Sequence, residues 1–128
     1  MIAAADLFDR EPERVATSRF LAEPGHHLLI AYEGTAPIGF VSGIETVHPD
    51  KGAEMFLYEL GVAESHRRRG VGRALVEGLA AIARSRDCYG MWVATDEANP
   101  AALATYQAAG AIRDELPAVI LTWSFRER

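Results

Sequence analysis

The stretch from Leu57 to Leu75 most constrains what this chain can fold into. An apolar-rich run leads into an arginine cluster, a Gly-Val-Gly sequence follows, and a helical pattern begins there. We expect a strand, a turn and a helix in that order. The first N–H groups of a helix have no internal partner, and the helix dipole is positive at that end. The turn is therefore suited to a phosphate-bearing group.

Glycines and arginines adapt this turn to a polyanion. Gly70 and Gly72 have no side chain, so the backbone can approach a bound group closely, and glycine tolerates the positive φ that such a turn often needs. Arginines would supply positive charge and forked hydrogen-bond donors. They are Arg67, Arg68, Arg69 and Arg73. The alternative interpretation is a solvated basic loop in which the glycines only mark a turn.

Two common phosphate-binding loops do not fit this turn. A P-loop needs a lysine directly after its last glycine, and the only lysine of the chain, Lys51, lies far away. A dinucleotide-binding fingerprint needs a tight turn right after the strand and a small residue at its third glycine position. Here the seven residues 63–69 separate the strand from the first glycine, and Leu75 occupies the third position.

Two stretches resemble signatures of the GNAT N-acetyltransferases. The segment 62–72 resembles the acyl-CoA-binding motif Arg/Gln-x-x-Gly-x-Gly/Ala, which follows a strand ending in valine. The segment 99–111 resembles the signature Asn-x-x-Ala-x-x-x-Tyr-x-x-x-Gly-Phe. The matching residues are Arg67, Gly70 and Gly72 in the first motif, and Asn99, Ala102, Tyr106 and Gly110 in the second. Glu64 replaces a proline that is common in the first motif, and Ala111 replaces the usual final phenylalanine.

The hydrophobic patterns predict one α/β domain over residues 1–128. Helices are expected at 3–10, 13–22, 71–86 and 99–110, and strands at 27–33, 37–47, 54–62, 90–95, 111–115 and 118–125. Asn99 as N-cap, Pro100 at the first helical position and Gly110 as the stop agree on the last helix. The resemblance implies a GNAT-like mixed, mostly antiparallel twisted sheet flanked by helices.

The first strand usual in that family is expected to be missing, because Met1 leaves no room for one before the first helix. Either this chain lacks the strand, or its true start was missed, or a partner subunit covers the exposed sheet edge. The last of these alternatives gives the hypothesis of a homodimer.

Composition and charge limit the classes of function. Hydrophobic residues make up 49% and charged residues 24%, no run of about 18 apolar residues predicts a membrane span, and no signal peptide is evident. Cys88 is the only cysteine, which fits a reducing cytoplasm, and the four histidines show no metal-ligand spacing. The net charge is −5, and outside the basic turn it is −9. This balance argues against nonspecific nucleic-acid binding and for a local anionic cofactor beside a cationic substrate, or it only keeps the protein soluble.

The resemblance implies acetyl-CoA as cosubstrate, lying between the strands 54–62 and 90–95 where they splay apart at a bulge. Its diphosphate would sit on the turn 67–73, and its pantetheine arm would pair with the backbone at Leu60 and Val62. The Val62 N–H would polarise the thioester carbonyl and stabilise the oxyanion. The residues implied to bind acetyl-CoA are Leu60, Gly61, Val62, Arg67, Arg68, Arg69, Gly70, Val71, Gly72, Arg73, Asn99 and Tyr106.

Two side chains are candidate catalytic residues. The resemblance places Tyr106 near the sulfur, where a phenol can protonate the leaving thiolate, although an aromatic residue on a helix is usually core. Glu59, three residues before Val62, is the candidate base for the amine, because partial burial can raise a carboxyl pKa toward neutrality. The alternative is a solvent-facing strand glutamate. Asp96 and Glu97 are rival bases or contacts to the charge of the substrate.

Much of the chain resembles one branch of the family, the type I aminoglycoside 3-N-acetyltransferases. That branch has an aspartate at the position of Glu59 and an alanine at that of Gly61. We therefore expect transfer of an acetyl group to a primary amine of a small cationic substrate, with an aminoglycoside as one candidate. The alternatives are a protein or peptide N-acetyltransferase and a non-catalytic acyl-CoA-binding sensor domain.

Overall fold

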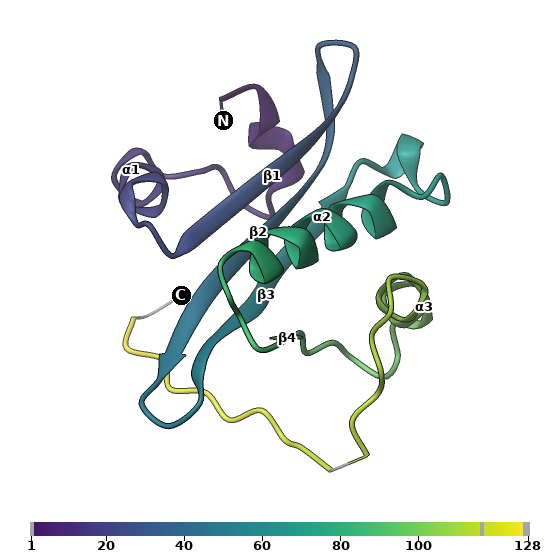
Figure 1. Ribbon diagram of the computed structural model, residues 1–128. Coiled ribbons are helices and arrows are strands. Elements are labelled where there is room, and N and C mark those ends of the chain that lie inside the picture. The colour runs from purple at the N-terminus through teal and green to yellow at the C-terminus, as the bar shows by residue number, and fades with distance from the viewer. Residues whose placement is uncertain (1, 116, 127–128) are drawn as a thin grey trace.

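A computed structural model describes residues 2–115 and 117–126 (Figure 1). A four-stranded sheet in the order β1-β2-β3-β4 forms its centre; β1, β2 and β3 pair antiparallel, and β4 joins β3 in parallel. Helix α2 crosses one face of the sheet, and α1 and the 3-10 helix η1 lie on the other (Figure 1). The elements are η1 (Ile2–Leu7), α1 (Arg14–Ala22), β1 (His26–Glu33), β2 (Ala36–His48), β3 (Gly52–Val62), η2 (Glu64–His66), α2 (Val71–Ser85), β4 (Met91–Trp92) and α3 (Pro100–Ala108).

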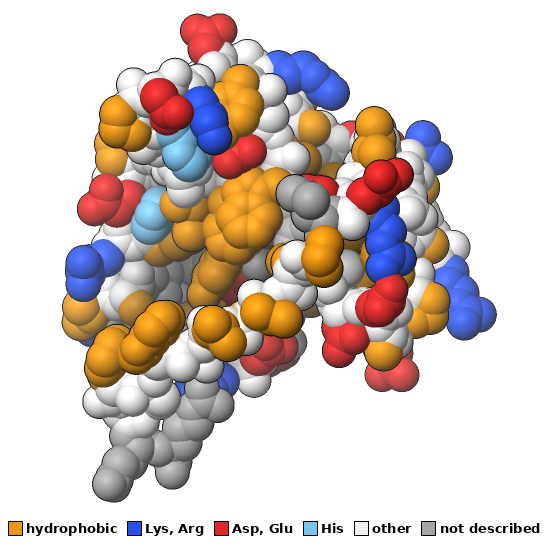
Figure 2. All heavy atoms as spheres, turned by 90° about the horizontal axis from the view of Figure 1, so that it is seen from below, with side chains coloured by type: hydrophobic (Ala, Val, Ile, Leu, Met, Phe, Trp, Pro, Cys, Tyr) orange, Lys and Arg blue, Asp and Glu red, His pale blue; other side chains and the backbone are white. Residues whose placement is uncertain are grey.

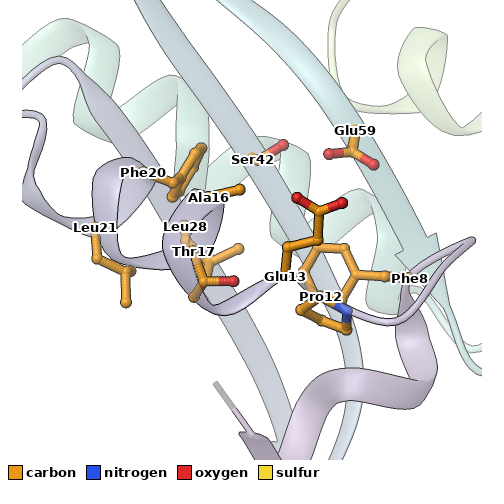
Figure 3. A pocket seen from close by; sticks show the side chains of 10 residues that line it. All are labelled: Phe8, Pro12, Glu13, Ala16, Thr17, Phe20, Leu21, Leu28, Ser42 and Glu59. Atoms are coloured by element: carbon orange, nitrogen blue, oxygen red, sulfur yellow. The ribbon is translucent and has the colours of Figure 1, made fainter. Parts of the chain in front are cut away.

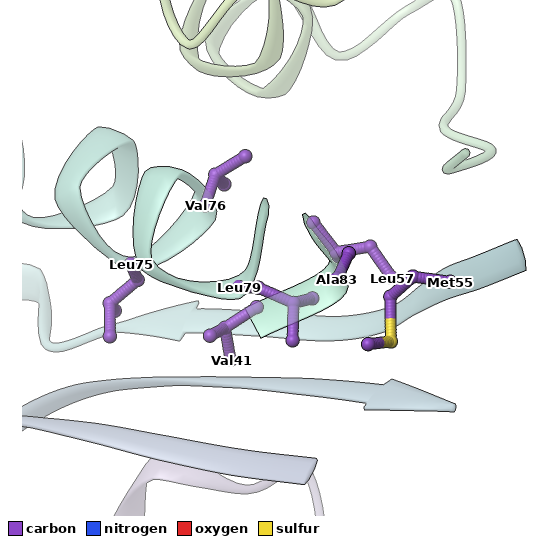
Figure 4. Packing of buried hydrophobic residues seen from close by; sticks show 7 residues of the cluster. All are labelled: Val41, Met55, Leu57, Leu75, Val76, Leu79 and Ala83. Atoms are coloured by element: carbon purple, nitrogen blue, oxygen red, sulfur yellow. The ribbon is translucent and has the colours of Figure 1, made fainter. Parts of the chain in front are cut away.

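The core lies between α2 and the strands β2 and β3 (Figure 4). Apolar residues recur at helical spacing on α2, and the buried ones are Leu75, Val76, Leu79 and Ala83. They pack on Val41, Met55 and Leu57 of the sheet. Gly43 permits the close approach, because a Cβ there would lie 2.7 Å from a methyl carbon of Leu79. This packing fixes where the N-terminus of α2 lies relative to the end of β3.

The opposite face of the sheet is covered by η1. The rings of Phe8 and Phe40 lie 4.2 Å apart between their centroids. A Cβ on Gly61 would come within 2.7 Å of the Phe40 ring and 3.1 Å of the Leu7 carbonyl oxygen, so only glycine fits there. The N-terminal segment is thereby held over β3 just before the strand ends.

The structure confirms the predicted fold class and most of the predicted elements. The sheet is mixed and mostly antiparallel, Asn99 caps α3, Pro100 begins that helix, and Gly110 takes a positive φ of 103° after it. In the part of the chain that the structure describes, η1 and α1 precede β1. The first helix is a 3-10 helix, and the strand expected at 90–95 is reduced to the two residues of β4.

The closing strands predicted at 111–115 and 118–125 are wrong. The described residues of these segments form no strand, and their apolar side chains are exposed, with Ile112 at 93% and Trp123 at 77%. Apolar and β-branched composition favours a strand only where a neighbouring strand offers pairing and burial. The described residues of these segments pair with no strand, so composition alone was not sufficient to predict their structure.

Candidate functional site: a free strand edge, a basic turn and a carboxylate pocket

In the part of the chain that the structure describes, no strand pairs with one edge of the second half of β3. β4 pairs with β3 only at Met55–Met91 and Phe56–Trp92, whereas β3 continues to Val62. The two strands therefore separate after two residue pairs. Backbone groups on that side of β3 are left free to pair with another extended chain.

A β-bulge lies where the strands separate. Ser42 of β2 pairs with Glu59, but the next residue, Gly43, pairs with Leu57. Tyr58 is thus the extra residue of β3, and such a bulge bends its strand and redirects the side chains beyond it. Because of the bulge, Glu59 faces the side of η1 and α1, away from the core.

The hydrogen-bond alternation shows which groups line the free edge. The Ala63 N–H donates to the Ile38 carbonyl at 2.8 Å, which marks these two as a hydrogen-bonded pair. Opposing residues of an antiparallel ladder alternate between bonded and non-bonded pairs. Leu60 and Val62 are therefore non-bonded positions, with N–H and C=O directed away from β2. The Val62 carbonyl accepts a hydrogen bond from Nε of Arg67 at 3.3 Å.

The turn after η2 leads to an open helix start. Arg68 and Gly70 take left-handed backbone conformations, with φ of 64° and 79°. Gly70 is the N-cap of α2 and provides no side-chain cap, while its carbonyl accepts the first helical hydrogen bond, from the Ala74 N–H at 3.0 Å. The N–H groups of residues 71–73 thus have no partner within the helix. A Cβ on Gly70 would meet nothing within 4 Å, so this corner is open.

Gly72 allows the start of α2 to lie against the end of β3. A Cβ on it would lie 3.2 Å from Cγ2 of Thr105 and 3.7 Å from Cγ2 of Val62. The first turn of α2 therefore lies directly against the end of β3 and against α3. The open amides of α2 and the free edge of β3 form one continuous backbone surface.

Carboxylates hold two of the arginines around the turn. Arg69 lies 3.4 Å from Glu33, and Nε of Arg73 donates to Glu77 at 2.6 Å. A hydrogen bond from His66 and the charges of His66 and Arg69 lower the pKa of Glu33. Apart from the His66 ring, the side chains of these ion pairs are well exposed, so each pair is individually weak. A bound phosphate could therefore replace the carboxylate as the partner of either arginine.

Glu59 lies beside a pocket of about 210 Å³ between the sheet and the η1–α1 segment (Figure 3). The apolar lining is Phe8, Pro12, Ala16, Phe20, Leu21 and Leu28, and the polar lining is Glu13, Thr17, Ser42 and Glu59. Burial raises the pKa of Glu59, and the negative charge of Asp9 raises it further. The pKa of the Glu59 carboxyl therefore lies closer to neutral pH than that of an exposed glutamate.

Tyr106 and Asn99 both lie on α3. Tyr106 is partly buried and packs against the core, and burial raises the pKa of its phenol, which stays protonated at neutral pH. The Asn99 side chain accepts a hydrogen bond from the Ala102 N–H at 3.1 Å. Its observed role is thus to cap the helix that carries Tyr106.

Asp96 and Glu97 lie in the exposed connection between β4 and α3. Oδ1 of Asp96 accepts a hydrogen bond from the Ala98 N–H at 2.8 Å, and Glu97 forms an ion pair with Arg113. Neither lines the pocket that holds Glu59. Among the described residues no cluster of histidine, cysteine and carboxylate groups could hold a metal ion.

The motifs in the sequence did not predict three residues that lie near Glu59, namely Asp9, Glu13 and Ser42. A signal for Ser42 was present, since it is the one polar side chain in the strand segment 38–44. No local pattern marks the two acids, because their position depends on how η1 and α1 fold back over the sheet.

Comparisons with known proteins agree with this geometry. The sequence matches the Acetyltransferase (GNAT) family over residues 3–111. It is 35% identical over 95 residues to the N-alpha-acetyltransferase RimI of Mycobacterium tuberculosis, across 74% of this chain and 58% of that protein, so the match spans less than two thirds of this relative.

Solved structures share the fold. An aminoglycoside acetyltransferase from an uncultured soil metagenomic sample is 27% identical, with a TM-score of 0.79 over 96% of this chain and 88% of that one. The aminoglycoside N-acetyltransferase AAC(6')-Iy, in complex with the bisubstrate analogue CoA-S-monomethyl-acetylneamine, is 21% identical, with a TM-score of 0.78 over 93% and 86% of the two chains. No helix in the part of the present chain that the structure describes has the length and apolar character to cross a membrane.

Proposed function

The chain belongs to the acetyltransferase (GNAT) family, and from that premise we propose that it transfers the acetyl group of acetyl-CoA to a primary amine of a cationic acceptor. One observation carries the proposal: the free edge of β3 ends directly against the uncapped N-terminus of α2. A thioester arm and a diphosphate need these two kinds of backbone surface side by side.

Acetyl-CoA supplies an activated acyl group on a thiol leaving group. The open amides of residues 71–73 bind the diphosphate, and the arginines of the turn add positive charge around it. The outward-facing backbone groups of Leu60 and Val62 bind the amides of the pantetheine arm. The Val62 N–H then donates to the carbonyl oxygen on which negative charge develops.

Glu59 acts as the general base of the transfer and Tyr106 as the general acid. The acceptor ammonium gives a proton to the Glu59 carboxylate, directly or through water, and the neutral nitrogen bonds to the acetyl carbon as the carbon–sulfur bond breaks. The departing thiolate takes its proton from the Tyr106 phenol, and the second proton that the nitrogen loses as the amide forms returns through water to the Tyr106 oxygen. The pKa directions support both roles, because a raised pKa makes Glu59 a better base and keeps Tyr106 protonated.

The similar proteins support two classes of acceptor, a small amine such as an aminoglycoside and the α-amine of a polypeptide. The first is supported by the aminoglycoside acetyltransferase that is 27% identical, the second by the 35% identity to an N-alpha-acetyltransferase. Exposed Asp96 and Glu97 would attract the positive charge of either. Thiol release from acetyl-CoA across aminoglycosides, polyamines and peptides tests the proposal. Tight acetyl-CoA binding without release to any amine would instead identify a non-catalytic sensor.

We propose in addition that the protein forms a homodimer. Figure 2 shows hydrophobic side chains gathered on the face seen from below, the side on which β4 and the C-terminal segment lie in Figure 1. Val119, Leu121, Trp123 and Phe125 are each at least 75% exposed. Exposed apolar side chains that gather on one face are typical of an interface. Light scattering after gel filtration should give twice the chain mass, and a monomer would refute the dimer.

A further inference from the structure

Resting on the proposed acetyl transfer, we infer that the acceptor is an amine carried on one compact apolar group, as in phenethylamine, and that this group occupies the pocket between α1 and the sheet. The names of the similar proteins do not determine whether the acceptor carries an apolar group. The inference follows from the size of the pocket, the character of its walls and the polar groups at its edge.

The walls of the pocket select a hydrocarbon body. Six of the ten lining residues are apolar, among them Phe20 and Leu21 of α1 and Leu28 of β1 (Figure 3). The volume of about 210 Å³ is below the ~300–1,000 Å³ typical of sites for drug-sized ligands. One aromatic ring or branched aliphatic group fits this space, whereas a second ring would extend into solvent.

The same walls disfavour an aminoglycoside ring. Each hydroxyl and ammonium of such a ring needs a partner once it leaves water, and an unpartnered buried polar group costs about 1–3 kcal/mol. The pocket provides two hydroxyls, on Thr17 and Ser42, and two carboxylates, on Glu13 and Glu59. That set suits one ammonium group and leaves most of the hydroxyls of a sugar unpaired.

The observation that points to a ligand here is the buried hydroxyl of Ser42. Ser42 is 2% exposed, and its hydroxyl oxygen is buried without a hydrogen-bond partner. It lines the pocket and lies directly across the ladder from Glu59. A serine in this apolar strand face is costly unless a bound group hydrogen-bonds to it. An ammonium between Ser42 and Glu59 would supply that hydrogen bond.

The ionisable side chains that line the pocket, Glu13 and Glu59, are both acidic. Glu13 is the N-cap residue of α1, yet its carboxylate makes no capping hydrogen bond, and it lines the pocket near Glu59 (Figure 3). Asp9 is close enough to act on Glu59 electrostatically. Three carboxylates would attract an ammonium and repel a carboxylate on the same carbon. A simple amine should therefore bind, and so should an amino acid whose carboxylate is blocked as an amide. A free amino acid should not bind.

A matched substrate series tests the acceptor class. Thiol release should be faster by about tenfold or more in kcat/KM for phenethylamine than for ethylamine or neamine. Phenylalaninamide should exceed phenylalanine by a similar factor, and a peptide that begins with phenylalanine separates a polypeptide source from a small-molecule one. A preference for neamine over phenethylamine would overturn the inference while leaving acetyl transfer intact.

Variants on α1 test the location. Ala16→Trp fills the pocket, whereas Val15→Trp adds the same side chain at a neighbouring position that is 73% exposed and does not line it. Calorimetry without acetyl-CoA should show phenethylamine affinity lowered about tenfold or more in Ala16→Trp only. Equal effects of the two substitutions would refute the location.

Ser42→Ala gives an independent readout. It should weaken phenethylamine binding without lowering the unfolding temperature, because the hydroxyl that is removed has no partner inside the protein. Unchanged phenethylamine affinity would count against the ammonium position. Binding that is lost in Ala16→Trp, in a protein that releases no thiol with any amine, would support the pocket and refute the transfer activity.

Discussion

Replacing Gly70 by alanine should damage acetyl-CoA binding more than it damages the fold. Gly70 has a φ of 79°, and a methyl group there would point into space with no protein atom within 4 Å. It would stand beside the open amides of residues 71–73, where we place the diphosphate. The substitution therefore separates a cost in backbone strain from a cost in binding.

The strain is the smaller of the two effects. A left-handed conformation costs a residue with a Cβ about 1–2 kcal/mol, partly offset by the ~0.4–1 kcal/mol gained from a less flexible unfolded chain. Gly70→Ala should thus lower the free energy of unfolding by about 1 kcal/mol, or the unfolding temperature by about 4 °C. Loss of the diphosphate contacts should raise the Kd for acetyl-CoA about tenfold or more, equivalent to about 1.4 kcal/mol.

Gly52 provides the matched control. It also has a positive φ, 92°, and open space around its missing Cβ, but it lies at the other end of β3. Urea unfolding should show similar losses for Gly52→Ala and Gly70→Ala, whereas calorimetry with acetyl-CoA should separate them. If Gly70→Ala binds acetyl-CoA as tightly as Gly52→Ala does, the amide corner is not the diphosphate site.

Further predictions concern the proton-handling groups and the core. Glu59→Gln should lower kcat about 10²-fold or more, because the base is removed. The same variant should be more stable than the native chain at neutral pH. The raised pKa means that the protonated form of Glu59 favours folding, and this contribution to stability is lost as pH rises through the folded pKa. Asp9→Asn should lower the pKa of Glu59 and move the acid limb of the kcat/KM profile to lower pH; an unmoved limb would point to another base. Tyr106→Phe should reduce kcat about tenfold or more with little change in unfolding temperature, and an unchanged kcat would assign that tyrosine to packing alone. Gly43→Ala should destabilise the chain by about 1–3 kcal/mol in urea unfolding, because the added methyl would overlap Leu79.

The elements with strong local signals were predicted well. The N-cap, first-position proline and glycine stop of α3 act within a few residues of one another, and the structure has all three where the sequence placed them. The apolar stripe of α2 likewise depends only on spacing along the helix. Glu59 was chosen from its position in a motif, and the structure adds the burial and the acidic neighbour that raise its pKa.

The first three strands were predicted to within two residues, but the strands expected after α2 were predicted poorly. A strand needs a neighbour to hold its backbone hydrogen bonds, and the segments 111–115 and 118–125 have the composition of strands without such a neighbour. β4 was shortened for the same reason, since only Met91 and Trp92 find partners on β3. These differences lie where long-range pairing outweighs local preference.

The sequence by itself determined the helices, the glycine turn and the family to which the chain belongs, because these depend on residues close together in the chain. Only the tertiary structure decided which backbone groups of β3 are free, that Ser42 lies opposite Glu59, and that Asp9 and Glu13 come to the same pocket. Those outcomes depend on strand register and on the docking of η1 and α1, both of which are set by contacts between segments far apart in sequence.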